Sequence, residues 1–111
     1  YFASATFNAS TTAYSATGEV GNSGTYAAGG STITMATPPS TDGTAGIFTP
    51  SASIVHTSFT AASFDCVLFY NSSQSIKAIS VHTFGTTSIV AGTFTLTMPA
   101  HAAATALIAI T

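Results

Sequence analysis

The chain of 111 residues contains almost no charge. Charged residues make up 4% of it, where roughly 25% is usual for a soluble domain. It has no arginine, and Lys77 is the one cationic residue apart from histidine. Since the net charge is −2, the chain lacks the basic face by which proteins bind phosphate backbones. We therefore expect no direct binding to nucleic acid.

Cysteine and long apolar runs are equally scarce. Cys66 is the single cysteine, so an intrachain disulfide is excluded, and its position within "FDCVLFY" predicts a buried, inert thiol. No segment approaches the roughly 18 uninterrupted apolar residues of a membrane span. We therefore expect neither a disulfide-stabilised module nor a membrane protein.

Serine and threonine fill the place of charge and make up about a third of the chain, while hydrophobic residues reach 46% and the mean hydropathy is +0.48. Such a surface lacks the charges that usually prevent strands from associating edge to edge. Two interpretations follow: the chain belongs to a larger assembly that covers it, or it is a neutral exported protein. The high hydropathy favours the assembly.

The hydrophobic pattern predicts β-strands, because apolar and polar residues alternate with period two between Gly-, Ser-, Thr- and Pro-rich turns. No segment predicts a helix beyond a single turn near residues 100–105. We predict an all-β, antiparallel sandwich or jelly-roll-like single domain over residues 1–111, loop- and turn-rich over 1–50 and strand-rich over 51–111. The strands are expected at 31–37, 46–50, 52–60, 66–70, 76–84, 92–99 and 106–111.

Two of these strands allow the buried face to be predicted. In 92–99 the apolar residues Phe94, Leu96 and Met98 are expected to point inward, and the intervening threonines outward. In 76–84, ended by Gly85, we expect the face with Ser80 and His82 to meet water. The run 66–70 is apolar throughout, which is typical of a strand buried on both faces.

No motif predicts catalysis, a metal or a cofactor. His56, His82 and His101 are far apart in sequence and have no Cys or His at metal-ligand spacing. The G-x-S-x-G motif of hydrolases is absent as well. We expect a hydrogen-bonded or exposed strand histidine at position 82; a ring of histidines around a trimer axis is the alternative, and it would make assembly sensitive to pH.

Three stretches resemble a known group of proteins when taken in order: "TTAYSATGEVGNSGTYAAGGSTIT", "VLFYNSSQSIKAISVHTFG" and "AGTFTLTMPAHAAATALIAIT". Together they resemble small virion-associated proteins of tailed bacteriophages and prophages. The resemblance rests on T-x-Y, G-E-V and Y-x-x-G-G, then on an apolar-Y-N-S strand, a K-A strand ending in F-G, and a G-T-F-T strand. It implies a non-enzymatic structural protein of the virion.

Within that group the resemblance favours a capsid decoration (cement) protein, which would bind the major capsid protein on the capsid exterior as a homotrimer and strengthen the shell through many weak, repeated contacts. The alternatives are a tail, neck or head-fibre component, an exported adhesin, and a host- or carbohydrate-binding module. The last would use Tyr14, Tyr26 and Tyr70 as exposed aromatic residues. The interface candidates are Lys77, His82, Leu107, Ile108 and Ile110.

Overall fold

The computed structural model describes residues 1–34, 39–102 and 104–110. The chain divides into two compact units, and each contains two separate stretches of sequence. Unit 1 comprises Tyr1–Gly30 and Thr57–Thr93, and unit 2 comprises Ser31–His56 and Phe94–Thr111.

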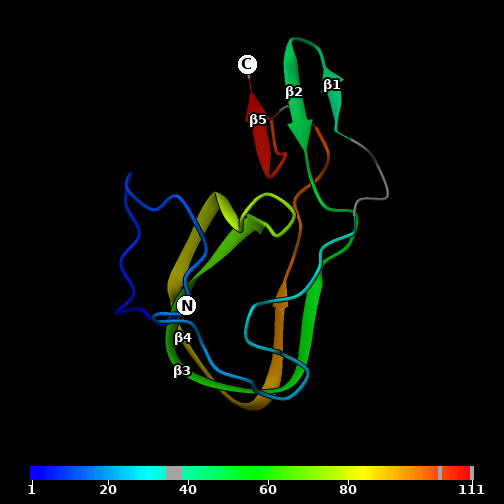
Figure 1. Ribbon diagram of the computed structural model, residues 1–111. Helices are drawn as coiled ribbons and strands as arrows, with labels where there is room; N and C mark the ends of the chain where they lie inside the picture. Colours follow the sequence, from blue (N-terminus) through cyan, green and yellow to red (C-terminus); the bar gives the residue numbers. More distant parts are fainter. Residues whose placement is uncertain (35–38, 103, 111) are drawn as a thin grey trace. The chain divides into compact units, whose positions relative to one another are not determined.

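The structure is built from β-strands, and no helix occurs in the described ranges. β3 (Ile54–Asn71) and β4 (Lys77–Leu96) form a two-stranded sheet, and β1 (Ser40–Asp42), β2 (Ala45–Phe48) and β5 (Ile108–Ile110) form a three-stranded sheet of order β1-β2-β5 (Figure 1). The predicted all-β class is therefore confirmed, while the sandwich or jelly-roll form stays a prediction. Among the described residues no helix is long and apolar enough to cross a membrane.

The strands of the long hairpin are fewer and longer than predicted. β3 joins most of the expected strand 52–60 to the expected strand 66–70, and β4 joins most of 76–84 to most of 92–99 through Gly85. Residues 52, 53, 76 and 97–99 were predicted as strand and lie outside both. No proline interrupts either strand, and a lone glycine lowers strand stability without ending the pairing. The turn between the two strands was predicted correctly, and the Asn71 side chain accepts a hydrogen bond from the Ser73 N–H there (2.9 Å).

Local irregularities keep the apolar residues of β3 on one face. Within unit 1 its buried side chains are Phe59, Ala61, Phe64, Cys66 and Phe69, a spacing that strict alternation does not give. Ser63 lies in the three-residue step from Ala61 to Phe64 and has a positive φ of 52°. An extra residue of this kind, a β-bulge, shifts the alternation by one and bends the strand. Over residues 57–93 the two ribbons curve together (Figure 1).

Aromatic rings form the core of unit 1. Phe64 contacts Phe59 and Phe84 edge to face, with centroids 5.5 and 5.8 Å apart, and Phe59 contacts Tyr26 at 5.9 Å. Each such pair contributes roughly 0.5–1.5 kcal/mol beyond the burial of its area. Cys66 is a buried free thiol, as predicted, and burial raises its pKa. Val67, Leu68 and Tyr70 are half-buried, so the run 66–70 is partly covered on its second face as well.

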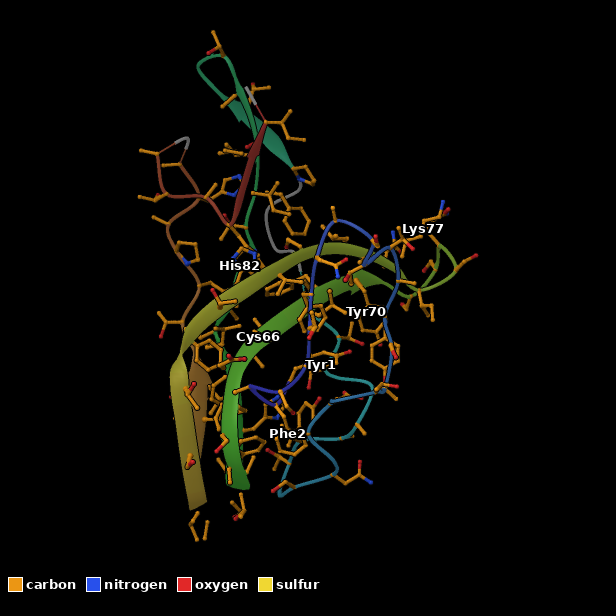
Figure 2. All side chains as sticks on the ribbon, turned by 90° about the vertical axis from the view of Figure 1, so that its left-hand side faces the viewer. Tyr1, Phe2, Cys66, Tyr70, Lys77 and His82 are labelled. Carbon is orange, nitrogen blue, oxygen red and sulfur yellow. The ribbon has the colours of Figure 1, made fainter. Side chains whose placement is uncertain are left out.

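Residues 1–30, here called the N-terminal arm, contain no strand and instead attach to the hairpin by backbone hydrogen bonds. The attachments join Tyr1 and Ala3 to Ser63–Asp65, Thr12 and Tyr14 to Ile76–Ala78, and Thr25 to Thr57. Figure 2 shows Tyr1, Phe2 and Tyr70 on the side of the curved hairpin along which the arm runs. The arm thereby covers the aromatic face and satisfies backbone groups at the strand edges.

Unit 2 has a small three-stranded sheet. The turn of its β1–β2 hairpin was predicted correctly, but β1 and the bounds of β5 were not. Gly43, with φ 63°, supplies the positive φ that a two-residue hairpin loop needs between Asp42 and Ala45. Residues 31–34 form no strand, which contradicts the prediction for 31–37, and residues 35–37 lie outside the described ranges. β5 is shorter than the predicted 106–111; Thr111 also lies outside the described residues.

The C-terminal stretch of unit 2 explains where β5 begins. A turn precedes it, in which the N–H groups of Thr105 and Ala106 both donate to the Ala102 carbonyl (3.0 and 2.7 Å). The Leu107 N–H then donates to the Thr49 hydroxyl (3.0 Å) instead of to a neighbouring strand. Backbone groups before Ile108 are therefore used by the turn and by Thr49, so the strand starts two residues after the predicted start at 106.

Gly24 provides a test of how the arm packs on the hairpin. Gly24 has φ +57°, and a Cβ added there would collide with the backbone of Thr57 and Ser58, whereas a Cβ at Gly21 would meet open space. We expect Gly24→Ala to lower the free energy of unfolding by about 2 kcal/mol or more, through overpacking and left-handed strain. Gly21→Ala is the matched control and should unfold like the wild type. Equal denaturant midpoints for both variants would contradict this packing.

Candidate interaction interface

The five predicted interface residues lie in different units. Lys77 and His82 belong to β4 in unit 1, while Leu107, Ile108 and Ile110 lie in or beside β5 in unit 2. Lys77 and Ile110 are exposed, and the other three side chains are half-buried.

Lys77 begins β4 at the turn of the long hairpin, as predicted. Its side chain is exposed, and Figure 2 shows it at the turn end of the hairpin. Its backbone N–H closes the turn by donating to the Gln74 carbonyl (3.2 Å). The backbone of Lys77 is thus fixed while its ammonium group stays in solvent, which suits a contact residue.

His82 lies on the more buried face of β4, so the prediction that Ser80 and His82 face water is wrong. Both are half-buried, whereas the neighbouring Ile79 and Thr83 are exposed. The reason is Phe84, which shares their face and packs on Phe64, and thereby fixes which side of β4 turns inward.

The local contacts of His82 agree with the predicted hydrogen-bonded strand histidine. Its Nε2 lies 3.0 Å from the Ser80 hydroxyl, and its ring meets Phe69 edge to face at 5.5 Å. These contacts hold the imidazole against its own sheet. A role for His82 in a subunit contact stays a prediction.

The C-terminal candidates surround a strand at the edge of the small sheet. Ile108 pairs with Phe48 and Ile110 with Gly46. The Ile110 side chain is 73% exposed, and within the described part of the sheet β2 is the one strand paired with β5. β5 carries no charged residue, so it lacks one of the usual devices that keep a sheet edge from pairing with another chain.

A half-buried cluster of three tyrosines and one carboxylate anchors the arm, and the sequence did not predict it. The Glu19 carboxylate accepts hydrogen bonds from the Tyr14 and Tyr26 hydroxyls, both at 2.6 Å, and from the Gly29 N–H at 2.7 Å. The Tyr70 hydroxyl donates to the Gly29 carbonyl, and its ring stacks on Tyr14 with centroids 4.8 Å apart. The cluster therefore connects three parts of the arm with β3.

The fold raises the pKa of three tyrosines of the arm, Tyr1, Tyr14 and Tyr26. The hydrogen bond to Glu19 raises the pKa of the Tyr14 hydroxyl from 10.0 to about 12. Burial, and then the hydrogen bond to Glu19, raises the pKa of Tyr26 well above its usual range. Burial is also the main cause that raises the pKa of Tyr1 to about 12. In all three cases the neutral, hydrogen-bonding form is the one that the fold stabilises.

These tyrosines do not form the exposed aromatic platform considered for a carbohydrate-binding module. Tyr14, Tyr26 and Tyr70 are half-buried, so the prediction that they are exposed is wrong. Their hydroxyls already donate to Glu19 or to the Gly29 carbonyl. The sequence did contain all five residues of the cluster within short motifs, namely T-x-Y, G-E-V, Y-x-x-G-G and Y-N-S.

The histidines do not gather into a metal site. In the part of the chain that the structure describes, no group of three or more His, Cys, Asp or Glu could hold a metal ion. In unit 2, His56 is buried, with its Nε2 3.4 Å from the Ser31 hydroxyl, and His101 Nε2 lies 2.9 Å from the Ser40 hydroxyl. His101 Nδ1 is buried without a hydrogen-bond partner among the described residues.

Removing one hydroxyl tests the importance of the Glu19 cluster. We expect Tyr26→Phe to lower the free energy of unfolding by about 1–2 kcal/mol, because the hydrogen bond to a carboxylate is lost in a partly buried site. Tyr70→Phe is the matched control; its hydroxyl bonds a neutral carbonyl, and its loss should cost about half as much. Urea unfolding of both variants measures the difference, and a larger loss for Tyr70→Phe would count against the central role of Glu19.

The raised tyrosine pKa values predict loss of stability in alkali. A proton bound more tightly in the folded state stabilises it fully below the unfolded pKa of 10, and this contribution is lost as the pH rises through the folded value, about 12 for Tyr14. We expect Tm to fall between pH 10 and 12 and the tyrosinate absorbance to rise late. Glu19→Gln should lower the pKa of Tyr14 towards 10, and an unchanged Tyr14 titration would refute the assignment.

Comparisons of the chain with protein-family models, with curated proteins and with solved structures found no match.

Proposed function

We propose that the chain is a non-enzymatic structural protein of a tailed-phage virion, and within it a capsid decoration protein. It binds major capsid proteins on the outside of the shell as a homotrimer and strengthens the shell by bridging them. The proposal joins the resemblance of the sequence to small virion proteins with one observation in the structure: large apolar side chains stand exposed on strands that carry almost no charge.

That observation concerns both units. In the described part of the chain five large apolar side chains are exposed, and the most exposed are Val90 at 82% and Ile110 at 73%; the others are Val55, Ile76 and Ile79. Four of the five lie on strands. β3 and β4 carry one charged residue each, Asp65 and Lys77, and no proline. Exposed β-branched residues on strands with so little charge favour association with another surface.

The core is correspondingly small. Among the described residues eight hydrophobic side chains are buried, and none of the chain's large side chains is less than 2% exposed. A chain with 46% hydrophobic residues thus keeps much of its apolar surface within reach of a partner. Covering that surface in a symmetric particle would contribute little per contact but much in total, because several weak contacts act together.

The carbohydrate-binding alternative has less support. Sugar sites need aromatic faces and free polar groups that converge in a concave site, and here the tyrosine hydroxyls are used within the Glu19 cluster. Because the Glu19 carboxylate accepts the hydrogen bonds of this cluster, we propose no acid–base role for it. A tail, neck or head-fibre component would use the same apolar strands, and binding experiments separate it from a decoration protein.

The proposal predicts a trimer that binds empty shells. Light scattering of the purified chain should give three times the monomer mass, and the protein should co-sediment at a stoichiometric ratio with shells assembled from the major capsid protein. Ile110→Ser is expected to shift the trimer towards monomer without lowering Tm, because this side chain is largely exposed. A monomer that ignores shells but binds purified tails would contradict the decoration role.

A further inference from the structure

The turn between β3 and β4 adopts a backbone that its sequence does not favour. The Lys77 N–H donates to the Gln74 carbonyl (3.2 Å), and both residues between them, Ser75 and Ile76, have φ 53°. Two successive positive φ angles are the mark of a type I′ turn, for which Asn-Gly is the preferred pair. A β-branched residue such as Ile76 is a true outlier in this region, because its side chain crowds the backbone.

The N-terminal arm holds the turn in this conformation. The Tyr14 N–H donates to the Ile76 carbonyl (2.8 Å), and the Ala78 N–H donates to the Thr12 carbonyl (3.0 Å). Tyr14 is in turn bonded to Glu19. Strained backbone persists where the surroundings over-determine it, and it gathers at sites that bind ligands or partners.

Three residues in or just after the strained turn have exposed side chains, and they are here called the tip patch: Ile76, Lys77 and Ile79. Ile76 is 42% and Ile79 50% exposed, and Lys77 is exposed as well. Lys77 and Ile79 share one face of β4, because residues two apart in a strand point to the same side. The patch thus combines the chain's single Lys with two apolar residues close to it in sequence, and Figure 2 shows Lys77 at the turn end of the hairpin.

Charge complementarity indicates the partner. A lysine beside apolar groups fits a surface that offers a carboxylate next to apolar side chains. A second copy of the chain is poorly suited to supply it: Glu19 already accepts three hydrogen bonds within its own chain, and Asp65 is half-buried. Asp42, in the β1–β2 hairpin, is the remaining acid through which a second copy could bind, and light scattering of Lys77→Gln tests that contact.

We propose that the tip patch is the surface by which the chain docks on the major capsid protein, at an apolar site there that carries a carboxylate. This rests on the proposed decoration function and adds to it the contact residues and the chemistry of the site. The turn keeps Ile76 in an unfavourable conformation because that conformation directs an apolar side chain at the partner.

Two glycine variants separate strain from contact. Ile76→Gly removes the apolar side chain and relieves the turn, so Tm should be no lower than that of the wild type, while the affinity for empty shells should fall about tenfold. Ser75→Gly relieves the same turn without removing an apolar group from the patch, and its affinity should equal the wild type. The readout is co-sedimentation with shells assembled from the major capsid protein of the phage or prophage that encodes the chain.

Lys77→Gln tests the charge without touching the turn. We expect an affinity about fivefold weaker at low salt and a flatter dependence of binding on salt concentration. The backbone of Lys77→Gln keeps its hydrogen bond to Gln74. This variant therefore still tests the docking site if Ile76→Gly loosens the turn. Light scattering of each variant without shells shows whether the patch instead joins copies of the chain.

The outcomes are distinct. Wild-type affinity in both Ile76→Gly and Lys77→Gln overturns the docking site and leaves the decoration function intact. A smaller oligomer for Lys77→Gln alone in solution also overturns it, since the patch would then be a subunit contact. If the wild-type chain itself does not bind shells, the decoration function fails and the docking site fails with it.

Discussion

The packing of unit 1 depends on one half-buried carboxylate, that of Glu19. Glu19 accepts hydrogen bonds from the hydroxyls of Tyr14 and Tyr26 and from the Gly29 N–H. These donors come from two parts of an arm that has no strand or helix of its own. An arm of 30 residues without regular structure has a large conformational entropy to lose on folding. Charge-assisted hydrogen bonds are the strongest polar contacts available to offset that loss, and in a chain with only three acidic residues Glu19 carries most of this role.

Fixing the arm has consequences for the whole of unit 1. The arm covers the aromatic face of the hairpin, where Phe59, Phe64 and Phe84 meet, and it supplies backbone partners to the β3–β4 turn. Glu19 thus acts at a distance on the tip patch: it fixes Tyr14, and the backbone of Tyr14 fixes Ile76. The hairpin alone would be a two-stranded sheet with one apolar face open to water, which is marginally stable at best.

Much of the fold could be predicted from the sequence, and the predictions that were wrong have physical reasons. Period-two patterning gave the all-β class and the outward threonines at 93, 95 and 97, which are exposed while Phe94 and Leu96 are half-buried. The merging of four predicted strands into two was missed, because a bulge such as Ser63 hides the alternation that marks a continuous strand. The orientation of His82 was missed because Phe84, not polarity, decides it. The Glu19 cluster was visible only as separate short motifs, since nothing local in a sequence tells which turns bring Tyr14, Tyr26 and Tyr70 together.

Amide hydrogen exchange in the wild type and in Glu19→Gln tests most directly whether Glu19 fixes the arm and, through it, the hairpin turn. The informative amides are those of Tyr14 and Ala78, which join the arm to the turn, compared with amides inside the β3–β4 ladder. If the carboxylate anchors the arm, Glu19→Gln will speed exchange at Tyr14 and Ala78 by at least tenfold and change the ladder amides much less. Equal protection of Tyr14 and Ala78 in both proteins would contradict the account.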